Sequence, residues 1–262
     1  MIRMIQCELL KLRKSKFYLA IILASCIYPI LLFVGNIGDS KLLDWNQYIF
    51  SVETASFMII IPPVSCLISA YIFSKEFSSG MCQNLFCYPE SRTKLFIAKL
   101  ITIMLLVVSL LIIQIFVTIL LGFISPHKLL TMKIMNTHFK LYLYIIFVQC
   151  CILPICILIT LILKNLIIPL IYGFILSVCN LFISTYFIVV GLKSSVVKNI
   201  VYNIPIFYNM PILYSCFKNK NGKAIAIKCN QILPTQSIII CITTFIIVNV
   251  ICILYYKNIE AS

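Results

Sequence analysis

A polar stretch between two long apolar runs carries the residue types whose spacing is most informative. These residues are Glu76, Phe77, Gly80, Leu85, Pro89 and Arg92. The apolar members recur at helical spacing, the glycine allows a close backbone approach, and the proline stops a helix before the next apolar run. The chemistry this pattern predicts is recognition, by a short amphipathic helix over residues 75–88 that a soluble partner binds. A solvated loop with ordinary cationic anchors explains the same residues equally well.

The sequence holds no recognisable machinery for making or breaking bonds. Its one Gly-Lys pair, Gly222-Lys223, is not followed by Ser or Thr and lacks the first glycine of a phosphate-binding loop. Cys82 and Cys87 have no second ligand pair at metal spacing, and neither His127 nor His138 belongs to a zinc pattern. We therefore expect no catalytic residue, no bound cofactor and no metal on this chain. Energy for any uphill work would have to come from another chain.

The composition indicates which elements must position these residues. Of 262 residues, 62% are hydrophobic and only 11% are charged, with a mean hydropathy of +1.10. A soluble domain draws about a quarter of its residues from Asp, Glu, Lys and Arg. A water-soluble globule is therefore excluded, and lipid must be the solvent for most of the chain.

Six charge-free stretches are long enough, at about 20 residues, to cross a hydrocarbon core of about 30 Å as helices. They are residues 17–37, 54–73, 100–124, 141–163, 166–190 and 237–256. The predicted fold class is all-α, a polytopic membrane protein whose single transmembrane domain covers residues 1–262.

The first 16 residues are amphipathic and differ from the spans. Ile2, Ile5, Leu9 and Leu12 recur at helical spacing beside a cluster of cations. This pattern predicts an interfacial helix over residues 1–16, an elbow that lies in the headgroup layer and turns into the first span. A secretory signal peptide is the competing interpretation, but no small-residue cleavage pattern closes the apolar run.

The net charge of +14 fits membrane topology better than nucleic-acid binding, because the cations are scattered between apolar runs and form no basic stripe. With an even number of spans and the N-terminus inside, the cytoplasmic side holds the first helix, the loop over residues 74–99, Lys164 and Lys257. We therefore expect a multi-pass protein of the plasma membrane with both termini in the cytoplasm.

Residues 191–236, before the last span, are apolar and aromatic but are interrupted by Pro205 and Pro211. Two prolines make a continuous buried helix costly, so we expect an extracellular re-entrant or surface element. An ordinary loop resting on lipid fits as well. Cys216 and Cys229, in the same stretch, are the one cysteine pair placed to form a disulfide.

None of the six predicted spans contains Asp, Glu, Lys, Arg or His. Ion-coupled carriers and intramembrane proteases place ionisable groups within the membrane, so both classes are disfavoured. A stand-alone channel is disfavoured because no polar ring lines a span. Pro62-Pro63 in the second span removes backbone hydrogen bonds and predicts a kink, which either lies beside a transport path or has no transport role.

These features, taken in order, resemble the permease subunits of ABC-2 type transporters. The matching pattern is Glu76-Phe-Ser-Ser-Gly80, Leu85, Pro89, Ser91-Arg92 and Lys99, preceded by the opening segment from Glu8 to Lys16. The resemblance covers essentially the whole chain, including its length and the Pro-containing segment before the last span. The Ile-Pro and Met-Pro pairs at Pro205 and Pro211 look most like the lantibiotic and bacitracin immunity exporters. Met81 and Cys82, however, stand where relatives often carry Thr and Lys.

The resemblance implies a permease subunit of an ATP-binding-cassette exporter that expels a peptide antibiotic from the membrane for self-protection or resistance. It implies a homodimer, or a heterodimer with a sister permease, docked on two ATPase subunits that bind Mg-ATP. Contact with the ATPase would fall to residues of a cytoplasmic coupling region over 74–94, namely Glu76, Phe77, Gly80, Leu85, Pro89 and Arg92. An amphipathic cargo would move laterally out of the bilayer along an apolar path.

A non-transporting membrane subunit, an anchor or a sensor for a partner ATPase, would share the coupling region. Neighbouring genes separate the two hypotheses. An adjacent ATPase gene with a second permease favours export, whereas a histidine kinase gene alone favours sensing.

Overall fold

The chain folds into a bundle of helices in the computed structural model, which describes residues 2–13, 17–36, 42–78, 91–186 and 235–258. The helices are α1 (Ile2–Arg13), α2 (Phe17–Asn36), α3 (Trp45–Ala55), the π-helical turn η1 (Ser56–Ile60), α4 (Ile61–Ser78), α6 (Arg92–Ile124), α7 (Met132–Leu163), α8 (Ile167–Tyr186) and α11 (Thr235–Asn258). A helix satisfies its backbone groups internally, as lipid requires. The predicted all-α class is confirmed for these residues.

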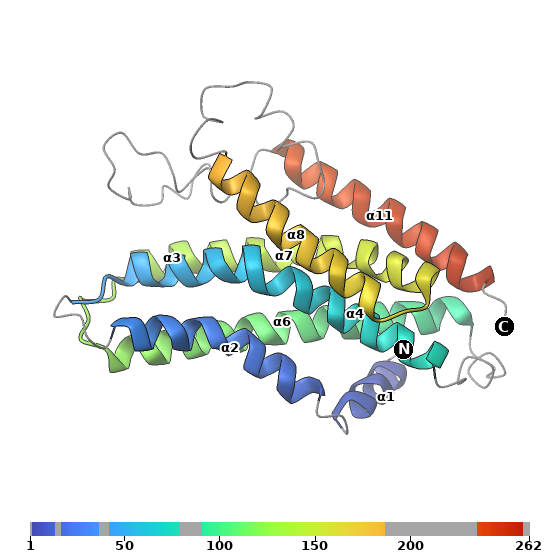
Figure 1. Ribbon diagram of the computed structural model, residues 1–262, viewed down its shortest axis with the longest axis horizontal. Helices are drawn as coiled ribbons and strands as arrows, with labels where there is room; N and C mark the ends of the chain where they lie inside the picture. The colour runs from blue at the N-terminus through green and yellow to red at the C-terminus, as the bar shows by residue number, and fades with distance from the viewer. Residues whose placement is uncertain (1, 14–16, 37–41, 79–90, 187–234, 259–262) are drawn as a thin grey trace.

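The continuous helical run α3–η1–α4 lies at the centre of the bundle (Figure 1). In the most apolar stretch of this run, 72% of the residues are buried inside the bundle, whereas only 17% are buried in the corresponding stretch of α11. α4 packs against α7 and α8, α11 packs against α7, and both α1 and α2 pack against α6. The central run therefore contacts elements from most of the chain.

In the part of the chain that the structure describes, five helices are long and apolar enough to cross a membrane, by length and composition. They are α2, the central run, α6, α7 and α11. The predicted sixth span, residues 166–190, corresponds to α8, whose apolar part Ile167–Phe182 is shorter than the other five. The predicted count of six spans is therefore not confirmed.

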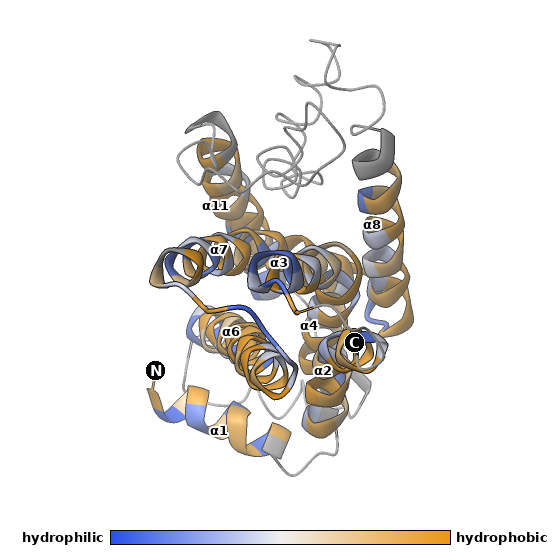
Figure 2. Cartoon of the chain, turned by 90° about the vertical axis from the view of Figure 1, so that its left-hand side faces the viewer, coloured by the Kyte–Doolittle hydropathy of each residue, from blue (hydrophilic) through white to orange (hydrophobic). Residues whose placement is uncertain are grey.

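The outside of the bundle is apolar, and Figure 2 shows mostly hydrophobic ribbons on the outer helices. Leu23, Phe116 and Phe182 are 67%, 63% and 74% exposed. Such side chains are stable outside a bundle when lipid covers them. Together with the five apolar helices, this surface defines a multi-pass membrane protein.

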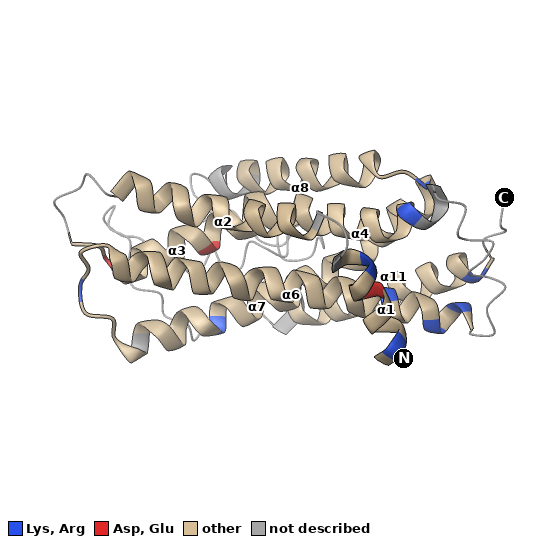
Figure 3. Cartoon of the chain, turned by 90° about the horizontal axis from the view of Figure 1, so that it is seen from below, with Lys and Arg blue, Asp and Glu red and all other residues tan. Residues whose placement is uncertain are grey.

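The bundle has two ends, which we call the α1 end and the Trp45 end (Figure 1). The α1 end holds α1, Ser78, Arg92, Lys164 and Asn258, and the Trp45 end holds Asn36, Trp45, Ile124 and Met132. Most Lys and Arg of the described helices lie at the α1 end (Figure 3), whereas Lys133 and Lys140 lie in the first turns of α7, toward the Trp45 end. The segments predicted to share one side of the membrane therefore lie together, while the side that this end faces stays a prediction.

α1 is a separate amphipathic helix that contacts α6 through Leu12, which is buried beside Leu106 and Leu110. Its polar face carries Glu8, whose carboxylate accepts a hydrogen bond from Lys11 at 2.6 Å. The helix thus occupies part of the predicted interval 1–16. Its placement in the headgroup layer stays a prediction.

Two loops pair at the Trp45 end. The backbone of Leu43 bonds to those of Pro126 and Lys128, forming a short parallel bridge. Trp45 follows at the start of α3, and its indole Nε1 donates to the Lys128 carbonyl at 2.8 Å. A Cβ on Gly122 would lie 2.5 Å from the indole ring, so the glycine makes room for the tryptophan.

The helices that contain three of the predicted spans include ionisable groups, which the predicted spans themselves lack. α3, α6 and α7 begin well before the predicted spans, because an ionisable residue was taken to end each span and the helices continue through it. Glu53, Lys99 and His138 lie within these helices and are 2%, 1% and 3% exposed.

Several predicted features lie outside the described residues. They are Gly80, Leu85 and Pro89 of the coupling region, the pair Cys82 and Cys87, the segment 191–236 and the candidate disulfide between Cys216 and Cys229.

Candidate functional site

The predicted coupling region, residues 74–94, begins in the last turns of α4 and ends in the first turn of α6. Glu76 and Phe77 lie in the last turn of α4, which stays helical to Ser78. α6 begins at Arg92, and the carbonyl of the preceding Ser91 accepts hydrogen bonds from two backbone N–H groups of its first turn. The first part of the predicted coupling helix is therefore helical.

Among the six predicted coupling residues, Arg92 is the one whose side chain the structure describes. Its Nη1 donates a hydrogen bond to the backbone carbonyl of Lys257 at 2.7 Å. The last carbonyls of a helix lack partners within the helix and carry partial negative charge, so a cation there is favourable. Arg92 thus caps α11 and joins one flank of the coupling region to the C-terminal helix.

Lys99 lies two turns further along α6, enclosed by aromatic rings. Its Nζ is 5.2 Å from the ring centroid of Phe73 and 5.6 Å from that of Tyr256, whose hydroxyl lies 3.5 Å away. Phe96 completes the set, with ring centroids 5.8 Å from Phe73 and 5.7 Å from Tyr256. Cation–π contacts reach about 2 kcal/mol when the cation is desolvated. We call these four residues the Lys99 cluster.

The Lys99 cluster joins three helices at the α1 end. Phe73 belongs to the last turns of α4, Phe96 and Lys99 to the first turns of α6, and Tyr256 to the last turn of α11. Both flanks of the coupling region therefore contact the end of α11 through buried side chains. A displacement of either flank must disturb α11.

The predicted pair Pro62-Pro63 stands at the start of α4, directly after η1. A proline has no N–H, so the carbonyl four residues earlier loses its helical partner. For Pro63 that carbonyl belongs to Ile59. The hydroxyl of Ser177 on α8 lies 3.1 Å from it and also 3.1 Å from the carbonyl of Gly173, so the one hydroxyl proton is shared between two acceptors. The chain stays helical through the pair, and its backbone irregularity is the π-helical turn. Whether the pair lines a transport path stays a prediction.

Gly173 lets α8 approach this irregular point closely. A Cβ there would lie 2.7 Å from the Cα of Pro63 and 3.1 Å from the Cβ of Cys66. Membrane helices use such small residues to bring backbones together. The α4–α8 contact therefore depends on the absence of a side chain at this position.

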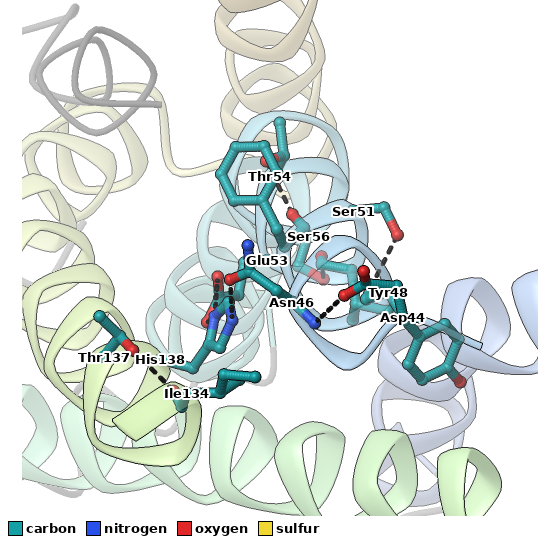
Figure 4. Close-up of polar contacts among 12 residues, drawn as sticks. Asp44, Asn46, Tyr48, Ser51, Glu53, Thr54, Ser56, Ile134, Thr137 and His138 are labelled. Carbon is teal, nitrogen blue, oxygen red and sulfur yellow. Dashed lines mark hydrogen bonds and ion pairs between the residues drawn. The ribbon is translucent and has the colours of Figure 1, made fainter. Parts of the chain in front are cut away.

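A buried polar cluster occupies the Trp45 end, and Figure 4 shows its members pointing toward one another. His138 Nδ1 on α7 lies 3.0 Å from both carboxylate oxygens of Glu53 on α3. Its Nε2 lies 3.1 Å from Oδ1 of Asn46, which lies about two turns before Glu53 on the same face of α3. Ionisable groups buried in membrane proteins are costly unless paired. We call these three residues the Glu53–His138 cluster.

Sequence reasoning missed this cluster because it treated Glu53 as the boundary of a span. The signal that could have revealed it is the apolar helical pattern that continues on both sides of Glu53 and of His138. No group of three or more His, Cys, Asp or Glu placed to hold a metal ion occurs in the part of the chain that the structure describes.

Between the two ends, Gln114 links three elements. Its Nε2 donates to the Ser25 carbonyl on α2 at 3.1 Å and to the Ser56 hydroxyl at the start of η1. All three side chains are buried. The π-helical turn is therefore held from one side by α6 and from the other by α8.

This arrangement of apolar helices, with an amphipathic first helix packed against them, is that of a polytopic membrane protein. Residues 4–180, more than half of the chain, match the family described as ABC-2 family transporter protein. The chain therefore belongs to this family, whose members are membrane permeases that normally work with an ATP-binding-cassette ATPase. No curated protein matches the chain.

Proposed function

We propose that this chain is the permease subunit of an exporter that expels a peptide antibiotic, of the lantibiotic or bacitracin kind, from the membrane for self-protection or resistance. Family membership supports the permease role. An amphipathic peptide suits the chain because the bundle exposes large apolar side chains along its helices, such as Phe116 and Phe182. A cargo dissolved in the bilayer would reach such surfaces laterally.

The partner ATPase would bind Mg-ATP and dock on residues 74–94 at the cytoplasmic side. The α1 end suits that side, because cations near span ends favour the cytoplasm and most of those in the described helices lie there (Figure 3). Two permease subunits, identical or sister chains, would complete the transporter.

The observation that carries this proposal is the connection between the coupling region and the rest of the bundle. Arg92 bonds to the end of α11, and the Lys99 cluster joins α4, α6 and α11. A push on residues 74–94 would reach three helices at once. An ordinary surface loop needs no such buried attachment.

Coexpression with the neighbouring ATPase tests the proposal. We expect the tagged chain to copurify with the ATPase in mild detergent, and cells with both chains to survive one class of peptide antibiotic better than cells lacking either. Copurification without any change in survival across a lantibiotic and bacitracin panel would replace export by the anchor or sensor role. Failure of the ATPase to bind would refute the coupling region.

Two substitutions examine the coupling region directly. Glu76→Lys reverses a charge, and Gly80→Trp adds a large side chain where the family pattern has glycine. We expect both variants to insert and assemble but to lose protection while ATPase activity continues. Thr131→Lys, at an exposed position of the Trp45 end, is the matched control and should protect normally. Normal protection by both coupling variants would count against this role.

A further inference from the structure

A cavity of about 130 Å³ lies between α3, α6 and α7 at the Trp45 end. Its lining is mainly apolar and includes Ile49 from α3, Ile115 and Ile119 from α6, and Leu130 before α7. Protein cavities of about 150 Å³ with such linings bind benzene. The size therefore suits one aromatic ring or a short hydrocarbon chain.

Two of the residues that line the cavity are exposed apolar side chains on the outside of the bundle. Met135 and Phe139, which line it, lie one turn apart on α7 and are 45% and 60% exposed. His138 and Tyr142, which also line it, are only 3% exposed. A molecule dissolved in the bilayer would thus pass two exposed apolar side chains before it meets the buried polar ones.

Three polar side chains line the cavity, and two already have hydrogen-bond partners. Both ring nitrogens of His138 contact the Glu53–His138 cluster, and the hydroxyl of Thr118 donates to the Gln114 carbonyl at 2.7 Å. The hydroxyl of Tyr142 is buried near the hydroxyl of Thr118, but it makes no hydrogen bond of good geometry with any described residue. Leaving a buried hydroxyl unpaired is unfavourable, because the group has lost its hydrogen bonds to water. A ligand oxygen would remove that cost by accepting its proton.

We propose that this cavity binds a small amphiphile that enters from the lipid phase, an aromatic or short-chain molecule carrying a hydrogen-bond acceptor. The apolar part fills the space beside Ile49 and Ile115, and the acceptor meets the Tyr142 hydroxyl. The Glu53–His138 cluster fixes one wall by holding α3 against α7. This site does not depend on the proposed export function and survives if that function is refuted.

The single tryptophan of the chain reports on the site. Trp45 lies one helical turn before the cavity residue Ile49, about 6 Å along the helix axis. Bromine quenches indole fluorescence at short range, so a brominated ring in the cavity should quench Trp45. The probes are bromobenzene, which only fills space, and 4-bromophenol, which adds an oxygen acceptor. Both are titrated into the purified chain in lipid nanodiscs.

We expect saturable quenching by both probes above the linear quenching caused by probe dissolved in lipid. Leu130→Phe fills the cavity and should abolish the saturable part. Leu129→Phe is the matched control, because Leu129 is 91% exposed and does not line the cavity, and it should keep that part. If Leu130→Phe and Leu129→Phe both lose the saturable part of the quenching, or both keep it, the proposed site is refuted.

A second pair of variants tests the hydrogen bond without filling the cavity. Tyr142→Phe should weaken 4-bromophenol binding about five- to tenfold, the equivalent of one hydrogen bond, and leave bromobenzene unchanged. Tyr48→Phe is the control, because the Tyr48 hydroxyl is also buried and makes no hydrogen bond with the described residues, but Tyr48 does not line the cavity. Equal affinity for 4-bromophenol in all three proteins would refute the role of Tyr142.

Discussion

Substituting Gly173 with alanine should separate α8 from the irregular point of the central helical run. The new Cβ would lie 2.7 Å from the Cα of Pro63 and 3.1 Å from the carbonyl oxygen of Pro62. These atoms belong to backbone or lie directly on it, so no side-chain rotation relieves the contact. α8 must move away by about 1 Å to restore an ordinary carbon–carbon separation of about 3.5–4.0 Å.

The expected loss of stability follows from three contributions. Overpacking of this kind costs about 1–3 kcal/mol. The same displacement stretches the 3.1 Å hydrogen bond from Ser177 to the Ile59 carbonyl beyond its useful range, which costs about 0.5–1.5 kcal/mol more. Alanine returns about 1 kcal/mol of helix propensity relative to glycine. The free energy of unfolding should therefore fall by about 0.5–3.5 kcal/mol.

Gly35→Ala is the matched control, because Gly35 lies in α2 and a Cβ there would meet no atom within 4 Å. Denaturant unfolding in detergent, followed by the single tryptophan, should show Gly35→Ala equal to or more stable than the unsubstituted chain and Gly173→Ala less stable. A double-mutant cycle adds Ser177→Ala, which should cost less in the Gly173→Ala background because the contact of Ser177 to Ile59 is already lost there, while its contact to the carbonyl of residue 173 lies within α8 and is kept. Equal stability of the two alanine variants would refute the close approach of α8.

Three further outcomes follow from the two ends of the bundle. Lys99→Met keeps the volume of the side chain but removes the buried cation, so coupled transport should fall while the ATPase still binds in a pull-down. Tyr256→Phe keeps the aromatic ring and should reduce transport less. A larger loss in Tyr256→Phe than in Lys99→Met would argue against the cation–π contact. Glu53→Leu should lower the free energy of unfolding by about 3–5 kcal/mol, because His138 then stays buried without its partner. The double variant Glu53→Leu, His138→Leu should lose less, because both partners are then apolar. If the loss in the double variant equals the sum of the two single losses, the two side chains are not paired. Gly122→Val should displace the indole beside it and shift its emission to longer wavelength, and an unchanged spectrum would show that the loop pairing absorbs the added volume.

The apolar helices were predictable because their cause is local. A run of about 20 residues without charge has no stable exposed state in lipid other than a helix, and α2 and α11 follow such runs closely. The ends of α3, α6 and α7 were not predictable from charge alone. Glu53 and Lys99 continue their helices because distant residues pair with them, and a rule that reads one residue at a time cannot include those partners.

The separations in sequence show why the buried contacts escaped prediction. Glu53 is 85 residues from His138, and Lys99 is 157 residues from Tyr256. Lys99 was recognised only as a member of a family pattern, and the pattern does not indicate that rings enclose it. Likewise, the prolines predict a free carbonyl at Ile59, but only the packing of α8 shows which hydroxyl bonds to it.

The central helical run connects the two ends of the bundle through one irregular point. Its first helix carries Ile49, a wall of the cavity, and its last turns carry Phe73 of the Lys99 cluster. A regular helix would transmit an axial displacement from one end to the other unchanged. Here η1 and the two prolines replace regular hydrogen bonds with contacts to α6 and α8, since Gln114 bonds to Ser56 and α8 bonds to the freed carbonyl. If a partner ATPase displaces the proposed coupling region, that displacement would be shared with these neighbouring helices before it reached the cavity, and the close contact at Gly173 would set how much of it α8 receives.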